Sequence, residues 1–260
     1  MNYQSKIIIK LLFFFLLLEN CNDIIDDKQE DFNIMPLEGV IKIFIEEFHH
    51  CYHSTCLPQI TLFFRTENIY PNCNNSIELQ LSIDKNEIYI DIQGILVPEI
   101  QLTAIGPASS SKIIEVKPGD YTIYITYAEN KDTYLLTVTD SSFCIKEKTK
   151  TFTIFQYKNV WRYKVNSFVY KCQKYSTDDS CDCIDFYEII KSMENIQEFH
   201  YPNNGISPYD DISNFFEYNM TPKYFLYNQE EDFDKIIDEA TKFPNRGGIR
   251  LISWLNKNYP

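Results

Sequence analysis

The sequence has little glycine, which accounts for only 7 of its 260 residues. Loops that bind phosphates need several glycines close together, because their backbone amides must approach the phosphate without a side chain between them. The chain also contains no Gly-x-Ser-x-Gly and no His-Glu-x-x-His sequence. These absences exclude a phosphate-binding glycine loop, a serine-hydrolase elbow and a zinc-protease helix. We expect no cofactor, and the missing motifs favour a non-enzymatic protein.

Basic side chains are also few. Lysine and arginine total 24, against 37 aspartate and glutamate residues, which gives a formal net charge of −13. Proteins that bind DNA or RNA neutralise phosphates with clusters of lysine and arginine. We therefore expect no nucleic-acid partner.

Long apolar runs are missing after the first twenty residues. The run near the start, Leu11–Leu18, follows Lys6 and Lys10 and is shorter than the roughly 20 apolar residues of a membrane span. A short apolar run behind basic residues is typical of a secretory signal. We therefore predict a signal peptide over residues 1–20 and export of the rest of the chain.

The end of this run, Leu18-Glu19-Asn20-Cys21, resembles the lipobox of bacterial lipoproteins, with Leu18 and Cys21 at the matching positions. The acidic residues that follow, up to residue 36, are similar to the tether of Bacteroidota surface lipoproteins. The resemblance implies that Cys21 is acylated, and acyl chains on one cysteine hold a soluble domain at a membrane. We expect a lipoprotein of the cell envelope, at the outer membrane or cell surface. The alternative is a secreted protein cleaved nearby.

Residues 76–139 show the alternation of apolar and polar side chains that is typical of half-buried β-strands. The apolar positions are Ile77, Leu79, Leu81, Ile83, Ile88, Ile90, Ile92, Tyr121, Ile123, Ile125, Tyr127, Tyr134, Leu136 and Val138. Turn residues separate them into four strands. One turn, Lys117-Pro118-Gly119-Asp120-Tyr121, resembles the Pro-Gly-x-Tyr turn of immunoglobulin-like and prealbumin-like surface modules. The pattern and the resemblance predict a β-sandwich over residues 37–172.

Further strands are expected on both sides of this block. They cover Ile60–Phe64, Gln101–Ala104, Phe143–Ile145, Thr151–Tyr157, Trp161–Val165 and Phe168–Tyr170. Leu37–Phe48 is either a strand or a short helix, because its periodicity does not separate the two. The serines Ser109–Ser111 are predicted to form a loop.

Helical spacing replaces the alternation from Cys183 onward. Ile184–Phe199 and Glu230–Phe243 are predicted to be amphipathic helices, and Ser207-Pro208 is typical of the start of another. Lys223–Tyr227 and Ile249–Leu255 are predicted strands. Residues 173–260 are therefore predicted to form a small α+β domain after the mainly β part.

The chain has eight cysteines, and an oxidising compartment makes disulfides their expected state. Apart from Cys21, they are Cys51, Cys56, Cys73, Cys144, Cys172, Cys181 and Cys183. Cys51 and Cys56 could close a short loop, and Cys172 could pair with Cys181 or Cys183. A bridge from Cys73 to Cys144 would clasp the two ends of the four-strand block. If Cys21 is acylated, seven remain, so at least one is unpaired, metal-bound or joined to another chain.

Three of the four histidines and two cysteines gather within residues 49–56. Imidazole and thiolate are the ligands that zinc and copper prefer. His49, Cys51, His53 and Cys56 are therefore a candidate metal site. The alternative is a loop closed by a disulfide, with exposed histidines.

Trp161 and Tyr163 alternate with Arg162 and Lys164. An exposed aromatic stripe of this kind could stack on sugar rings, whereas a buried one would belong to the core. The sequence as a whole favours a non-enzymatic binding module whose partner is an envelope protein or a glycan. The alternatives are an envelope hydrolase acting on glycans or peptides, and a structural or assembly lipoprotein.

Overall fold

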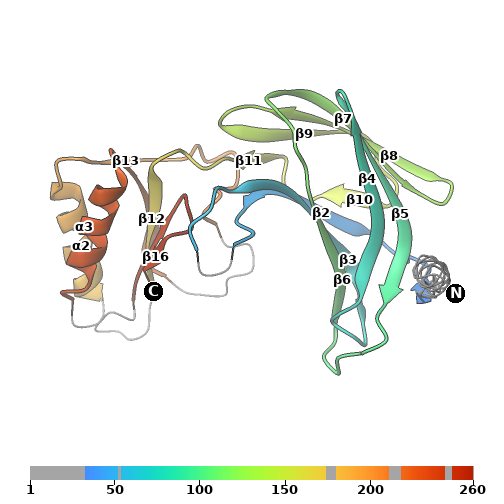
Figure 1. Cartoon of the computed structure of the whole chain (residues 1–260), viewed down its shortest axis with the longest axis horizontal. Coiled ribbons are helices and arrows are strands. Elements are labelled where there is room, and N and C mark those ends of the chain that lie inside the picture. The colour runs from blue at the N-terminus through green and yellow to red at the C-terminus, as the bar shows by residue number, and fades with distance from the viewer. Residues whose placement is uncertain (1–32, 52–53, 174–179, 211–217, 244–247, 260) are drawn as a thin grey trace, which may run out of the picture. The chain divides into compact units, whose positions relative to one another are not determined.

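The computed structural model describes residues 33–51, 54–173, 180–210, 218–243 and 248–259. Residues Ile34–Pro260 form one compact unit. Within it, sixteen described strands make three sheets, and two described helices cover the third (Figure 1). The fold is therefore mainly β with a small α+β part at the C-terminus, as the sequence predicts.

The first sheet, sheet A, has seven strands in the order β1-β5-β7-β8-β9-β11, with β4 also paired to β5. Its strands are β1 (Asn33–Met35), β4 (Ser76–Asp84), β5 (Glu87–Val97), β7 (Gly119–Tyr127), β8 (Asn130–Val138), β9 (Ser142–Thr149) and β11 (Asn159–Trp161). The four strands predicted within residues 76–139 are all present, as β4, β5, β7 and β8. Apolar and polar side chains alternate along these strands because one face of sheet A packs on a second sheet and is buried.

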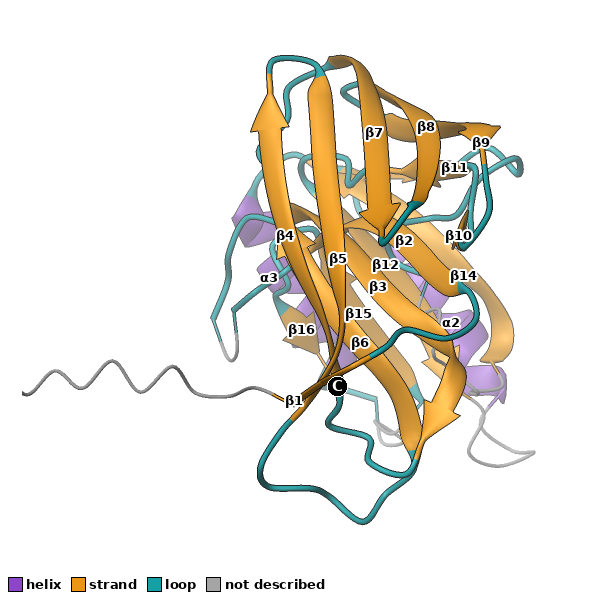
Figure 2. Ribbon diagram, turned by 90° about the vertical axis from the view of Figure 1, so that its right-hand side faces the viewer, coloured by secondary structure: helices purple, strands orange, loops and turns teal. Residues whose placement is uncertain are grey.

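Sheet B has the order β10-β2-β3-β6 and supplies the other half of the sandwich (Figure 2). Its strands are β2 (Ile41–Phe48), β3 (Gln59–Tyr70), β6 (Gly106–Ile113) and β10 (Thr153–Phe155). Leu37–Phe48, left open between strand and helix, therefore contains a strand. Its partner β3 bonds along the whole length of β2, from Ile41 opposite Thr66 to Phe48 opposite Gln59.

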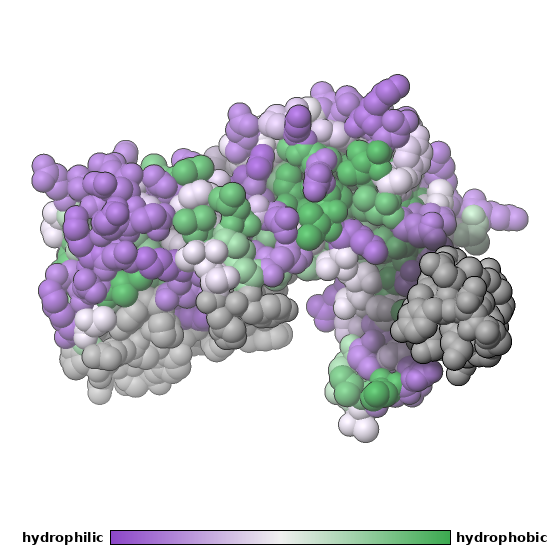
Figure 3. Space-filling view, in the orientation of Figure 1, coloured by the Kyte–Doolittle hydropathy of each residue, from purple (hydrophilic) through white to green (hydrophobic). Residues whose placement is uncertain are grey.

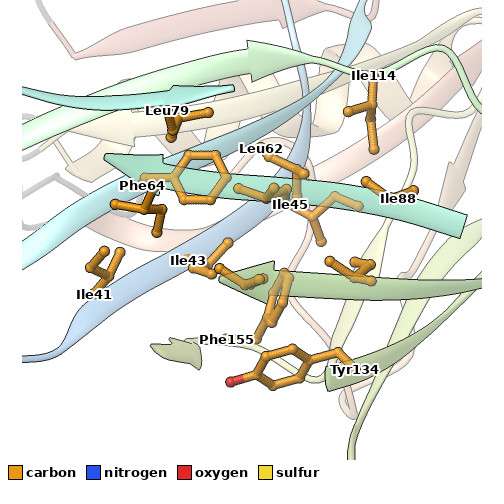
Figure 4. Packing of buried hydrophobic residues seen from close by; sticks show 14 of the residues in the cluster. Ile41, Ile43, Ile45, Leu62, Phe64, Leu79, Ile88, Ile114, Tyr134 and Phe155 are labelled. Atoms are coloured by element: carbon orange, nitrogen blue, oxygen red, sulfur yellow. The ribbon is translucent and has the colours of Figure 1, made fainter. Parts of the chain in front are cut away.

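The core of the sandwich consists mainly of aliphatic side chains, with a few aromatic ones, from the facing sides of sheets A and B (Figure 4). Ile41, Ile43 and Ile45 of β2 meet Ile88, Leu79 and other residues of sheet A. Tyr134 is the largest fully buried side chain of this core, and its hydroxyl donates to the Thr153 carbonyl at 2.8 Å. Burial raises the pKa of Tyr134 to about 12, so the phenol stays protonated and keeps this bond.

Two predictions around β6 were wrong. Ser109–Ser111 belong to β6 rather than to a loop, and Gln101–Ala104 lie in the loop before it. Small residues hide the strand pattern of β6: Gly106 and Ala108 fill the inner positions, while Ser109 and Ser111 point outward. Pairing with β3, in which Ser111 lies opposite Phe63, stabilises this strand despite its weak local preference.

Sheet C has the order β13-β14-β12-β15-β16. Its strands are β12 (Ser167–Gln173), β13 (Ile196–Phe199), β14 (Tyr218–Tyr227), β15 (Ile249–Ser253) and β16 (Asn258–Tyr259). The helices α2 (Ser180–Ser192) and α3 (Glu230–Ala240) pack on it around Phe168, Phe186 and Phe233. β12 bonds to both β14 and β15. Residues 167–172, which the sequence placed with the sandwich, therefore lie inside sheet C.

The predicted helix over Ile184–Phe199 is a helix followed by a strand. α2 ends at Ser192, the amide of Ile196 donates to the Met193 carbonyl at 3.2 Å, and Ile196–Phe199 then forms β13. Residues 196–199 form a strand because they pair with β14 at the edge of sheet C, with Ile196 opposite Tyr227. This long-range pairing is invisible to local periodicity.

Ser207 begins a turn with the hydrogen bonds of a helix cap. Its hydroxyl accepts from the Tyr209 amide at 3.1 Å, and the Asp210 carboxylate accepts from the Ser207 amide at 3.0 Å. The rest of the helix predicted there lies in residues 211–217, outside the described part of the chain. Within the described part, no helix is long and apolar enough to cross a membrane.

Two disulfides join cysteines in the described part of the chain, Cys51–Cys56 and Cys172–Cys183. Both pairings were among those that the spacing allowed. The possible bridge between Cys73 and Cys144 is not formed, because neither thiol makes a disulfide among the described residues. Cys73 precedes β4, and Cys144 lies inside β9, between β8 and β11. β4 and β9 belong to the same sheet, so backbone hydrogen bonds through the intervening strands connect the two ends of the block without a disulfide.

Candidate functional site

A cleft of about 910 Å³ lies against the outer face of sheet B. Its lining residues from the β2 to β6 part are Phe44, Glu46, Glu47, Phe48, His49, Cys51, Phe63, Phe64, Arg65, Ser109, Ser110 and Ser111. The opposite side is lined by Tyr163, Lys171, Pro208, Tyr209, Asp210, Ile252 and Asn256. Figure 3 shows a hollow on this side of the molecule. The volume lies within the usual range for a small-molecule or short-oligomer site.

Aromatic side chains form the floor of the cleft on sheet B. Strand alternation places Phe44 and Phe48 of β2 on the face opposite to the sandwich core, and Phe63 of β3 lies directly opposite Phe44. The rings of Phe48 and Phe63 meet edge to face with centroids 5.3 Å apart. Phe44 and Phe63 are only half-buried, so their outward surfaces are available to a ligand.

Polar groups border these rings on the same face. Arg65 of β3 lies opposite Ser109 of β6, and Phe63 lies opposite Ser111. Arg65 and both serines are exposed. Arg65 has no ion-pair partner within the residues that the structure describes, so its guanidinium has hydrogen-bond donors for a ligand.

The opposite wall is built from tyrosines held by backbone contacts. The Tyr163 hydroxyl donates to the Pro208 carbonyl at 3.0 Å, and its ring meets Tyr209 edge to face at 4.8 Å. Lys171, which is buried, donates to the Tyr209 carbonyl at 2.6 Å. Burial raises the pKa of Tyr163 and of Tyr209, so both phenols remain neutral. The two tyrosine rings therefore present neutral surfaces to the cleft.

One buried carboxylate fixes the segment between the two walls. Glu47 accepts from Arg162 Nε at 2.8 Å and from the Tyr163 amide at 2.7 Å. Arg162 also donates to the Thr139 carbonyl at 2.9 Å. Glu47 occupies a core-facing position of β2, so its charge is compensated by these donors rather than by water.

Two of the three carboxylates that line the cleft, Glu47 and Asp210, accept hydrogen bonds from the protein itself. Both oxygens of Glu47 accept hydrogen bonds from Arg162 and Tyr163. Asp210 accepts from the Ser207 amide with one oxygen and from the Tyr224 hydroxyl, at 3.2 Å, with the other. Glycoside hydrolysis needs one carboxylic acid that gives a proton and one carboxylate that attacks or activates water. Because their oxygens already accept hydrogen bonds from the protein, Glu47 and Asp210 are better placed to support a binding surface than to catalyse glycoside hydrolysis.

The candidate metal ligands are not brought together in the structure. Cys51 and Cys56 are bonded to each other, which removes both thiolates, and His49 contacts the Trp254 carbonyl at 2.7 Å. His53 lies outside the described residues. Elsewhere in the described chain, no group of three or more His, Cys, Asp or Glu side chains is placed to hold a metal. The segment instead forms the disulfide-closed loop that was the alternative.

Of the two aromatic candidates, Tyr163 lines the cleft and Trp161 does not. Trp161 donates from Nε1 to the Pro202 carbonyl at 3.0 Å, and a side chain larger than hydrogen at Gly205 would collide with its ring. Cys21 lies outside the described residues. Phe44, Phe63 and Arg65 were not predicted as site residues, although in the structure they lie on the outward faces of β2 and β3. Sequence alone did not indicate that this outward face borders a cleft.

Comparison of the chain with models of known protein families, with curated proteins and with solved structures found no match.

Proposed function

We propose that the protein is a lipid-anchored binding protein of the cell envelope that holds a glycan in the cleft beside sheet B. The observation that carries this proposal is the combination of the half-buried rings of Phe44 and Phe63 with the exposed polar groups of Arg65, Ser109 and Ser111. Ligand sites typically combine apolar walls with a few convergent polar groups that fix orientation. Sugars present both kinds of surface, because their ring faces are apolar and their edges carry hydroxyls.

The proposed role is non-enzymatic. Its support is the state of Glu47 and Asp210, each of which accepts hydrogen bonds at both oxygens from the protein itself. A carboxylate held in this way is a poor proton donor or nucleophile unless the bonds are broken. A hydrolase of glycans or peptides is the second candidate, and turnover of a bound oligosaccharide would support it.

The proposed location is supported by the first residues of the sequence. The basic start, the short apolar run and the lipobox-like Leu18 to Cys21 favour a lipoprotein. Two or more acyl chains on Cys21 would hold the protein stably at a membrane. Intact mass spectrometry of protein from native membranes would test this, because an acylated Cys21 adds a defined mass to a chain that lacks residues 1–20.

Binding to oligosaccharides from bacterial envelopes tests the role of the cleft. We expect Phe63→Ala and Arg65→Ala each to weaken binding about tenfold, which corresponds to about 1.4 kcal/mol. Ile113→Ala is the matched control: Ile113 is exposed on the same sheet but does not line the cleft, so binding should be unchanged. Equal affinity of the wild type and Phe63→Ala, or binding only to peptides, would overturn the proposal.

A further inference from the structure

A cluster of exposed aliphatic side chains lies where β3 ends and β6 begins. Ile69, Ile100, Leu102 and Ile105 are 67%, 80%, 50% and 75% exposed, and we call these four residues the apolar tip. Figure 3 shows hydrophobic surface at this end of the sandwich, below the strands that Figure 1 labels β3 and β6. Exposed large aliphatics normally occur singly, so a group of four indicates a contact surface.

The loop that carries three of these side chains is held in place by hydrogen bonds. The Asn74 side chain donates to the Ile100 carbonyl at 2.7 Å and accepts from the Leu102 amide at 3.2 Å. The Cys73 amide donates to the Ala104 carbonyl at 2.7 Å. Three backbone groups of the loop therefore already have partners within the protein, while the side chains of Ile100 and Leu102 remain exposed. A loop in this state can enter an apolar phase without leaving these backbone groups unpaired.

The described chain begins at the same end of the sandwich. β1 pairs with β5, and a side chain at Gly94 would lie 2.6 Å from the Met35 carbonyl oxygen and 2.7 Å from Ile34. The loop with the apolar tip leaves β5 directly after Val97, only three residues beyond Gly94. Figure 2 shows β1 beside this end of β5. Ile34 is itself 41% exposed and extends the apolar surface toward the tether.

The chain between Cys21 and Asn33 limits how far this end can lie from an anchored cysteine. Twelve residues span at most about 40 Å when fully extended. An acyl group on Cys21 would therefore keep β1, and the apolar tip beside it, within reach of the bilayer. Within residues 98–105, Glu99 is the one ionisable side chain, so little charge opposes entry of the loop.

We infer that the apolar tip inserts into the lipid interface and forms a second membrane contact beside the acylated cysteine. The inference rests on the proposed lipid anchor but not on the glycan cleft. A single lipid attachment leaves a domain free to tumble, whereas two contacts fix one end of the sandwich toward the membrane. Insertion of Ile100, Leu102 and Ile105 removes their apolar surface from water, which is the driving force for interfacial binding.

Tryptophan fluorescence in brominated-lipid vesicles tests this inference. The full chain from native membranes is reconstituted into phosphatidylethanolamine and phosphatidylglycerol vesicles with brominated acyl chains, which quench nearby indoles. We expect the added emission of Leu102→Trp, after subtraction of the wild-type signal, to shift to the blue and to be lost to quenching. Tyr89→Trp is the matched control, because Tyr89 is exposed on the same strand as Val97 but about 26 Å along it. Its emission should be unaffected.

A second variant separates insertion from a change in folding. Ile100→Asp placed in the Leu102→Trp background should restore unquenched emission, with an unchanged circular dichroism spectrum. Quenching that persists in this variant, or equal quenching at positions 89 and 102, would overturn the inference. Unquenched emission of Leu102→Trp would also overturn it. The intact mass of the protein in the same preparation then shows whether Cys21 is acylated, and therefore whether the proposed anchor has failed as well. Glycan binding by the same protein reports on the cleft independently.

Discussion

Glu47 and Arg162 lie 115 residues apart in the sequence, and the guanidinium of the second donates to the carboxylate of the first through Nε at 2.8 Å and through a terminal nitrogen at 2.7 Å. Glu47 is 7% exposed. The pair joins the end of β2 to the segment between β11 and β12, which leads into sheet C. This largely buried ion pair is therefore one of the contacts that hold the two cleft walls in place.

Glu47→Gln should lower the free energy of unfolding by roughly 3 kcal/mol, because it leaves the Arg162 charge without its partner in a mostly buried site. Urea unfolding at neutral pH measures this. Glu67→Gln is the control, since Glu67 makes an exposed ion pair with Lys42 and the change should be small. In a double-mutant cycle with Arg162→Met, strictly additive losses would show that the two side chains do not interact.

Asp132 is fully buried and accepts five hydrogen bonds, from the amides of Thr151, Phe152 and Thr153 and the hydroxyls of Thr151 and Thr153. Burial raises the pKa of this carboxyl, but the hydrogen bonds outweigh burial and hold the pKa below its usual value. Asp132→Asn should therefore cost about 3 kcal/mol at neutral pH, because an amide cannot accept from all five donors.

The same lowered pKa predicts the acid sensitivity of the fold. The stabilisation by Asp132 is complete above the unfolded-state pKa of about 3.9 and is lost as the pH falls below it, because the folded state must then take up a proton at a lower pKa. The urea midpoint of Asp132→Asn should consequently depend less on pH between about 4 and 2 than that of the wild type. Asp120→Asn, at an exposed aspartate bonded to Thr137, should retain the wild-type dependence.

The Cys51–Cys56 disulfide closes a loop whose end bonds to the C-terminal part of the chain, since the Cys56 amide donates to the Leu255 carbonyl at 3.2 Å. Replacing both cysteines by serine should lower the free energy of unfolding by about 2 kcal/mol, as expected for a short closed loop. Cys73→Ser is the control, because Cys73 is exposed and pairs with no described cysteine. Rapid alkylation of Cys51 in the native, unreduced protein would contradict the pairing.

His49 is predicted to titrate below its usual range. Burial lowers its pKa from 6.5 and outweighs the hydrogen bond to the Trp254 carbonyl, which raises it. Because the folded pKa lies below the unfolded value, the neutral ring stabilises the fold fully above about pH 6.5, and this contribution is lost as the pH falls. NMR titration of the ring protons measures the pKa, and His49→Gln assigns the resonance. A pKa of 6.5 or higher would contradict the prediction that burial against Tyr163 dominates the environment of the ring.

The sequence alone identified four strands of sheet A, which are Ser76–Asp84, Glu87–Val97, Gly119–Tyr127 and Asn130–Val138. They could be identified because apolar and polar side chains alternate along any strand that has one buried face, and this alternation is a local property of the sequence. The amphipathic helix α3 could also be predicted from the sequence, because Phe233 and Ile236 lie at helical spacing. Acidic residues in its first turn mark its start, where the helix dipole favours them.

Other features depend on contacts between distant segments and could be seen only in the tertiary structure. It made Ser109–Ser111 a strand and Ile196–Phe199 the edge of sheet C, because the bonding partners of these segments lie far away in the chain. It also decided that Phe44, Phe63 and Arg65 border a cleft. Alternation shows that a side chain points out of the core, but only the packing of distant segments determines whether it then faces water, a ligand or another part of the fold.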